Sequence, residues 1–183
     1  MTRPTAISLF SGAGGMDIGI RKAGFNVLYS LELAPFCCLT LRSAVERDKN
    51  DTTVIEGDMR GIDPTMFCGK SEKIRGELDL LFGGPPCQPF SLAGKQNGLE
   101  DDRGPLLLEI VRFAKSLMPK VILLEQVKGL LSARGRNGEK GGVFHQFLSV
   151  LAQIGYESKW KVCCAAEYGV PQMRERVFVV ARP

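Results

Sequence analysis

The chain has 183 residues, of which 44% are hydrophobic and 24% charged, the composition of one globular domain with a real core. No apolar run reaches membrane-spanning length and no signal-peptide pattern opens the chain, so neither a membrane protein nor a secreted one is expected. The formal net charge of +4 permits a nucleic-acid partner without demonstrating one. The six cysteines resemble neither a disulfide framework nor a zinc site. Free thiols in a reducing compartment, bacterial cytoplasm or nucleus, are therefore expected.

Strand-like apolar runs alternate with helical segments along the chain. In chain order, we expect a strand at 6–10, a helix at 16–23, a strand at 25–31, a helix at 34–46, strands at 52–56 and 78–82, a helix at 105–117, a strand at 121–124, a helix at 143–154, and strands at 157–165 and 177–181. The segment 60–76 is expected to be a loop with one helical turn, and 134–142 a solvated loop. This alternation predicts an α/β fold of one domain over residues 1–183, with βαβ units and a mostly parallel sheet covered on both faces.

Residues able to do chemistry follow the expected strands repeatedly. The glycine turn 11–15 follows the first strand, Glu32 closes the second, Asp58 follows the third, Cys87 follows the fourth and Glu125 closes the fifth. Ligands of such sheets bind at the carboxyl ends of the strands. We therefore expect these residues to form one site.

Cys87 lies in an unusual loop, Gly83-Gly84-Pro85-Pro86-Cys87-Gln88-Pro89. Proline fixes φ and removes backbone donors, and glycine lets another molecule approach closely, so the loop is stiff and open. A thiol presented there is placed like a nucleophile. The alternative is a cysteine that serves as a small core residue.

The other candidates each have a functional and a structural interpretation. Gly12, Gly14 and Gly15 let backbone approach a ligand, although their spacing is not the full dinucleotide fingerprint. Glu32 is placed to bind ribose hydroxyls, or it is an acid at a helix start. Asp58 is placed to accept from an adenine amino group, or it is a turn aspartate.

Two arginines and an acid complete the set. Burial in the run that Glu125 ends would raise the pKa of its carboxyl unless it is paired; the alternative is a surface acid bound to Lys128 or an arginine. Arg174 and Arg176 project to the same side of an extended segment, so they need an anionic partner unless both are solvated. The single histidine, His145, is expected to be structural or exposed in a helix, which disfavours a Cys–His protease. Trp160, Cys163 and Cys164 are expected to be core residues.

Together these motifs resemble the DNA (cytosine-5)-methyltransferases. The resemblance rests on the run 7–15, on the catalytic loop 84–91, on Asp102-Arg103-Gly104-Pro105-Leu106, on Glu125-Gln126-Val127 and on Gln172-Met173-Arg174-Glu175-Arg176, which occur in the family's order. It implies a Rossmann-like fold for S-adenosylmethionine and methyl transfer to carbon 5 of cytosine in double-stranded DNA, with no metal. Such an enzyme flips the base out of the duplex.

The resemblance also implies a role for each matching residue. Cys87 would be the nucleophile that adds to carbon 6, Glu125 would hold the base, and Arg174 and Arg176 would bind the base carbonyl and orient the loop. The cofactor would be bound by Phe10, Gly12, Gly14, Gly15, Glu32, Asp58, Met59, Pro86 and Leu106.

Three departures from the family accompany the resemblance. Gln126 replaces the usual asparagine that positions the catalytic loop, and Ser8 replaces a common aspartate. The target-recognition domain and the late segment that completes the cofactor fold are not in the sequence. The hypotheses are thus a methyltransferase catalytic domain with a fold incomplete at its C-terminus, one subunit of a split enzyme that needs a second chain, and a non-catalytic DNA- or cofactor-binding remnant.

Overall fold

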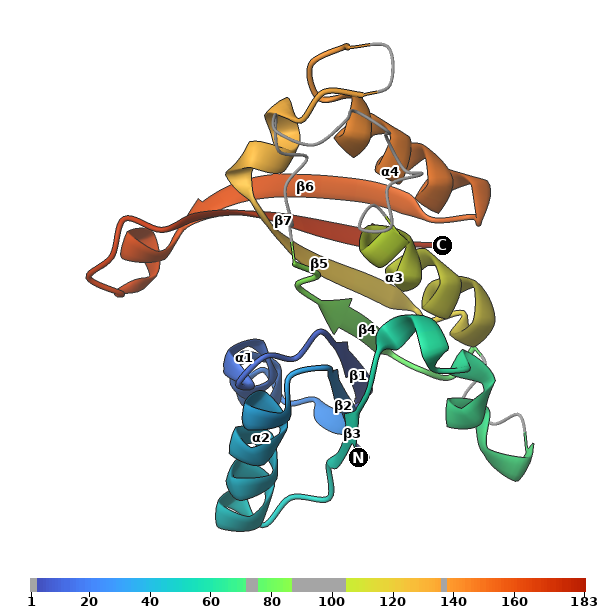
Figure 1. The fold of residues 1–183 in the computed structure, drawn as a ribbon, viewed down its shortest axis with the longest axis vertical. Coiled ribbons are helices and arrows are strands. Elements are labelled where there is room, and N and C mark those ends of the chain that lie inside the picture. The colour runs from blue at the N-terminus through green and yellow to red at the C-terminus, as the bar shows by residue number, and fades with distance from the viewer. Residues whose placement is uncertain (1–2, 72–75, 87–104, 136–137) are drawn as a thin grey trace.

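The structure is a computed structural model that describes residues 3–71, 76–86, 105–135 and 138–183. Within these ranges no helix has the length and apolar character needed to cross a membrane. Figure 1 shows one twisted sheet with its helices, and the ends of the chain at N and C.

The strands and helices alternate as predicted through most of the chain. They are β1 (Thr5–Leu9), α1 (Gly15–Lys22), β2 (Asn26–Glu32), α2 (Pro35–Asp48), β3 (Thr53–Glu56), the 3-10 helices η1 (Met59–Gly61) and η2 (Pro64–Ser71), β4 (Leu80–Gly83), α3 (Pro105–Leu117), β5 (Val121–Val127), η4 (Lys128–Ser132), α4 (Gly142–Gln153), β6 (Glu157–Cys164), η5 (Ala165–Tyr168) and β7 (Glu175–Arg182).

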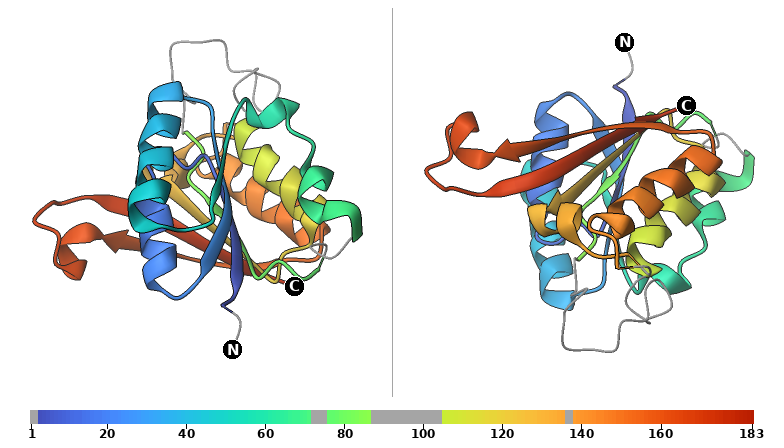
Figure 2. Two further views of the ribbon diagram at one scale, coloured as in Figure 1. Left: turned by 90° about the horizontal axis from the view of Figure 1, so that it is seen from below. Right: turned by 90° about the horizontal axis from the view of Figure 1, so that it is seen from above.

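Within the described residues, seven strands form one sheet in the order β3-β2-β1-β4-β5-β7-β6. The first five in that order are parallel, whereas β7 runs antiparallel to β5 and to β6. The α/β fold and the mostly parallel sheet are confirmed. The β6–β7 hairpin extends beyond the body of the sheet, as Figures 1 and 2 show.

Helices cover both faces of the sheet, as predicted. Figure 2 shows α1 and α2 on one side of the strands and α3 and α4 on the other. On the α1 side, Met16 and Ile20 pack against a small cluster that includes Val27, Leu80 and Phe82. This arrangement buries both faces of the parallel strands, which explains their nearly continuous apolar sequences.

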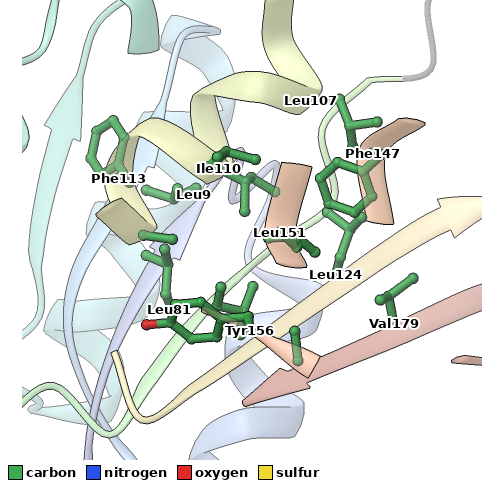
Figure 3. Packing of buried hydrophobic residues seen from close by; sticks show 14 of the residues in the cluster. Leu9, Leu81, Leu107, Ile110, Phe113, Leu124, Phe147, Leu151, Tyr156 and Val179 are labelled. Atoms are coloured by element: carbon green, nitrogen blue, oxygen red, sulfur yellow. The ribbon is translucent and has the colours of Figure 1, made fainter. Parts of the chain in front are cut away.

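The main core lies between the sheet and the helices α3 and α4 (Figure 3). Alternate residues of the strands point into it, for example Ile122 and Leu124 of β5 and Val179 of β7. Tyr156 closes one end of this core, and its hydroxyl donates to the carbonyl of Pro119 at 2.6 Å. The core therefore fixes β5, which carries Glu125 and Gln126 of the predicted site.

Several expectations about local structure were wrong. The described part of segment 60–76 contains the end of η1 and the whole of η2 rather than one helical turn. Strand β5 continues to Val127 because its last residues pair with β7, so Glu125 lies inside a strand rather than at its end. Trp160 was expected in the core, but it lies on the edge strand, is 49% exposed and packs edge-on against Phe144.

Candidate active site

The sheet register brings the predicted residues to one edge. Leu31, Leu9, Gly83 and Leu124 form one row of paired residues across β2, β1, β4 and β5. The next residue along each of these strands is Glu32, Phe10, Gly84 and Glu125, respectively. Glu32, Phe10, Gly84 and Glu125 therefore lie at one edge of the sheet, and Asp58 follows β3, which pairs with β2. The expectation that Cys87 shares this edge stays a prediction.

The glycine turn after β1 depends on conformations that favour glycine. Gly12 and Gly14 have φ values of +54° and +87°. A Cβ on Gly14 would lie 2.8 Å from Cδ2 of Leu41, whereas a Cβ on Gly12 or Gly15 would meet nothing within 4 Å. The turn is thus packed against α2 at Gly14 and open at Gly12 and Gly15.

Glu32 holds this turn from the side of β2. Its Oε2 accepts a hydrogen bond from the Gly12 N–H at 2.7 Å, and its Oε1 accepts from the N–H groups of Leu33 and Ala34 at 2.9 Å each. The carboxylate therefore joins the β1 turn to the start of α2. Each carboxylate oxygen has more than one lone pair, so the group can still accept from a ligand hydroxyl.

Phe10 lies between β1 and the glycine turn in a strained conformation. Its φ is +55°, a value that residues other than glycine rarely adopt. The side chain is half-buried and packs against the main core. Backbone strain of this kind is concentrated at ligand sites, and here it lies where the cofactor was predicted.

Asp58 and Met59 begin η1, after β3. The carboxylate of Asp58 caps the turn by accepting from the Arg60 N–H at 2.9 Å, and it pairs with the Arg60 guanidinium at 2.6 Å. These hydrogen bonds hold the pKa of the Asp58 carboxyl below its usual value. The Met59 side chain is buried in the main core, and its carbonyl accepts from Arg112 at 2.7 Å. Contacts of either residue with adenine stay predictions.

Cys87 and the residues that follow it, as far as Gly104, lie outside the described residues. The two residues before it are described: Pro85 is buried and Pro86 is exposed. Leu106, in the first turn of α3, is half-buried. The roles of Pro86 and Leu106 in cofactor binding stay predictions.

Gln126 fixes the approach to Cys87. Its Nε2 donates to the carbonyl of Pro85 at 2.6 Å, and its side chain is only 4% exposed. The sequence raised the question of whether glutamine could replace the shorter asparagine at this position. The extra methylene is accommodated, because the amide reaches the backbone two residues before Cys87.

Glu125 and the two arginines form one cluster beside that loop. Arg176 Nε lies 2.9 Å from Glu125 Oε1, and Arg174 Nη2 lies 3.9 Å from the same oxygen. The anionic partner expected for the arginine pair is therefore Glu125, whereas Lys128 pairs with Glu175 instead. A Cβ on Gly84 would approach Glu125 Oε2 to 3.1 Å, so the carboxylate lies directly against the loop that leads to Cys87.

Other expectations concern cysteine and histidine. Cys37, Cys38, Cys163 and Cys164 are free thiols, as predicted for these four, although Cys163 and Cys164 are only half-buried rather than core residues. His145 is exposed on α4, in agreement with the expectation that it is not part of the site.

Asp17, which is fully buried behind the glycine turn, was not among the candidates predicted from the sequence. It is one polar position within the first turn of a short helix, where an acid is ordinary. Only the fold shows that serine hydroxyls from β1 and β2 converge on it.

Comparison with known proteins decides the family. Residues 5–182 match the family model for C-5 cytosine-specific DNA methylase. The chain belongs to this family. It is 44% identical to the type II methyltransferase M.AquIA of Picosynechococcus over 182 residues, which cover 95% of this chain and 70% of that protein. It is 42% identical to the type II methyltransferase M.NgoMIV of Neisseria gonorrhoeae, covering 97% of this chain and 51% of the relative.

Solved structures of methyltransferases share the fold. A DNA modification methyltransferase encoded within an Escherichia coli prophage superposes with a TM-score of 0.77 at 25% identity, over 98% of this chain and 46% of that one. The Dnmt2 methyltransferase of S. pombe superposes with a TM-score of 0.70 at 20% identity, over 98% of this chain and 51% of that one. The chain thus spans about half the length of these methylase structures and of M.NgoMIV.

Proposed function

We propose that this chain carries the cofactor-binding and catalytic part of an enzyme that transfers a methyl group from S-adenosylmethionine to carbon 5 of cytosine in DNA. The observation that supports the proposal most strongly is the cluster at the end of the sheet. There a carboxylate held by two arginines lies against the loop that leads into Cys87. Family membership gives this cluster a substrate, cytosine in DNA.

The residues after β1 and β2 fit S-adenosylmethionine. The space beside Gly12 and Gly15 would be filled by a Cβ, so glycine keeps it open for a ligand against the backbone. The Glu32 carboxylate lies beside the same turn and can accept from ribose hydroxyls. When bound, S-adenosylmethionine supplies the electrophilic methyl group.

Cys87 would supply the nucleophile. Its thiolate adds to carbon 6 of a flipped cytosine, which makes carbon 5 electron-rich enough to take a methyl group. Loss of the proton on carbon 5, to water, then regenerates the ring double bond as the bond between sulfur and carbon 6 breaks. The thiolate is released, so the cysteine is not consumed.

Glu125 would act on the other side of the ring. Its carboxyl group, oriented by Arg176, can hold ring nitrogen 3 and the exocyclic amine while the thiolate adds. The arginines also supply positive charge where the base carbonyl would lie, and their shared contact with one oxygen keeps the cluster compact.

The test is methyl transfer from labelled S-adenosylmethionine to DNA, with the product base identified by digestion and chromatography. The proposal expects 5-methylcytosine with the wild-type chain and none with Cys87→Ser. Label in another base, or unchanged transfer by Cys87→Ser, would contradict it.

A second candidate is that the chain is one subunit of a split methyltransferase, for which a partner chain supplies target recognition. Exposed apolar side chains gathered in the β6–β7 hairpin favour it. Trp160 is 49% exposed, Tyr168 66%, Val170 47%, Met173 85% and Val180 45%. A partner that covers the hairpin would bury these side chains.

The same assay separates the candidates when it is repeated with the product of the adjacent reading frame. Transfer only in the presence of that product supports the split enzyme. Binding of S-adenosylmethionine with no transfer in either mixture supports a non-catalytic remnant and contradicts the proposed activity.

A further inference from the structure

A buried polar cluster lies directly behind the glycine turn. Asp17 is 0% exposed, and the serines at positions 8, 11 and 30 are 1%, 8% and 0% exposed. These residues come from three elements, since Ser8 belongs to β1, Ser30 to β2 and Asp17 to α1, while Ser11 opens the turn. Asp17 is the one acidic side chain among the buried polar residues of the described structure.

The hydrogen bonds of the cluster have a direction. The Ser8 hydroxyl donates to Asp17 Oδ1 at 2.6 Å, and the Ser30 hydroxyl donates to Oδ2 at 2.5 Å. The Ser11 hydroxyl donates to Ser8 Oγ at 2.8 Å. Because the Ser8 hydroxyl donates its hydrogen bond to Asp17, its oxygen is left to accept from Ser11. The Asp17 carboxylate therefore orients the hydroxyls of Ser8 and Ser11.

The carboxylate is costly to bury. Burial raises the pKa of the Asp17 carboxyl, although the two serine hydroxyls and the charge of Arg21 act in the opposite direction. A buried charge stabilises a fold less well than apolar packing of the same volume does, so stability alone does not account for it. A carboxylate that orients two hydroxyls can, however, specify one geometry for the turn that they reach.

The turn is held from two sides. On one side the Glu32 carboxylate accepts from the Gly12 N–H, and on the other the Ser11 hydroxyl is linked through Ser8 to Asp17. The Ser11 N–H also donates to the carbonyl of Leu31 at 3.0 Å. Gly12 follows Ser11 directly, so the position of Ser11 determines where the open face of the turn lies.

We propose that Asp17 is a positioning residue for the cofactor: acting through Ser8 and Ser11, it holds the glycine turn in the geometry that binds S-adenosylmethionine. The inference rests on the proposed function for the identity of the ligand. It adds a residue that does not touch the cofactor and acts through two hydroxyl groups.

The two serines that donate to Asp17 offer a matched pair of variants. Ser8→Ala and Ser30→Ala each remove one hydroxyl donor from the same buried carboxylate, at nearly equal distances. Only Ser8 is also linked to Ser11. Both variants should lower the thermal stability, whereas only Ser8→Ala should release the turn.

The first measurement is the binding of S-adenosylmethionine by titration calorimetry. We expect Ser8→Ala to weaken binding roughly tenfold, the scale of one lost hydrogen bond to a charged group, and Ser30→Ala to weaken it much less. Equal weakening by both variants would show that general destabilisation is responsible, and would overturn the inference. No binding by the wild-type chain would contradict the proposed function, and the positioning role for this cofactor with it.

The second measurement needs no cofactor. It therefore separates a failure of the positioning role of Asp17 from a failure of the proposed cofactor binding. Hydrogen exchange of the amides of Ser11 and Gly12, both hydrogen-bonded in the structure, is followed in the free protein. The two variants are compared under conditions in which their unfolding free energies are equal. Faster exchange in Ser8→Ala than in Ser30→Ala then supports positioning of the turn by Asp17. Equal exchange in the two variants overturns it, whatever the wild-type chain binds.

Discussion

The hydrogen bond from Gln126 to Pro85 gives the sharpest mutational test of the site. Gln126→Met keeps nearly the same length and volume but removes the donor, and it leaves the carbonyl of the buried Pro85 without this partner. Losing such a bond and leaving one buried acceptor unpaired costs about 1–3 kcal/mol of unfolding free energy. The loop leading to Cys87 loses its anchor at the same time, so methyl transfer should fall more than stability alone explains.

The chain contains a matched control at the other end of β5. The Tyr156 hydroxyl donates to the carbonyl of Pro119 at 2.6 Å, the same distance and the same kind of buried acceptor as in the Gln126 bond. Tyr156→Phe should therefore lower the unfolding free energy by a similar amount, about 1–3 kcal/mol. It lies away from the site, so it should leave the rate of transfer unchanged under conditions in which the protein is folded.

The assay combines urea unfolding with single-turnover methyl transfer, measured with the chain alone or, if transfer requires it, with the product of the adjacent reading frame. We expect both variants to unfold at lower urea concentration and only Gln126→Met to slow transfer, by roughly tenfold or more because misplacement of a reacting group is costly. Equal rates in the two variants would refute the idea that Gln126 positions the loop. Unchanged stability in Gln126→Met would refute the hydrogen bond itself.

Three further predictions concern the same site and the core. Gly84→Ala would place a Cβ 3.1 Å from Glu125 Oε2, so the carboxylate must shift. The rate of methyl transfer should fall roughly tenfold with little change in melting temperature, and an unchanged rate would contradict the placement of Glu125. Arg176→Lys should reduce the rate of methyl transfer by at least about tenfold while S-adenosylmethionine still binds, because an ammonium group cannot reproduce the guanidinium contact with Glu125. Weaker cofactor binding by this variant in calorimetry would show that Arg176 has another role. Burial raises the pKa of Tyr156 to about 12, from about 10 in the unfolded chain, so the stability contributed by the protonated hydroxyl is present below pH 10 and is lost as the pH rises to 12. The urea midpoint of Tyr156→Phe should therefore fall less steeply between pH 10 and pH 12 than that of the wild type. Equal slopes of midpoint against pH would contradict the burial of the hydroxyl.

The site residues at the carboxyl ends of β1, β2 and β5 were predictable because they follow short apolar runs in the sequence. A short run such as Val121–Leu124 predicts a buried strand, and in an α/β sheet the residues after such strands meet at one edge. We grouped the glycine turn, Glu32 and Glu125 from this pattern without knowledge of side-chain contacts, and the strand register places them at one edge of the sheet. Phe10 was identified from the family resemblance instead.

What could not be predicted depends on pairing between distant segments. The antiparallel placement of β7 beside β5 extends β5 to Val127 and brings Arg176 to Glu125, and neither follows from local periodicity. The burial of Asp17 is a similar case, since an acid in the first turn of a helix is usually solvated. Trp160 was misplaced for the opposite reason: a large aromatic side chain favours the core, but β6 is an edge strand.

The most direct test of the central claim is covalent trapping at Cys87. On DNA that carries 5-fluorocytosine, the ring cannot lose fluorine as it loses a proton, so a nucleophile bonded to carbon 6 stays attached after methyl transfer. We expect the protein that transfers methyl groups, alone or with the product of the adjacent reading frame, to form a protein–DNA adduct on a denaturing gel. Mass spectrometry should assign the adduct to Cys87, and Cys87→Ser should abolish it. An adduct that persists in Cys87→Ser, or that maps to another residue, would show that Cys87 is not the nucleophile.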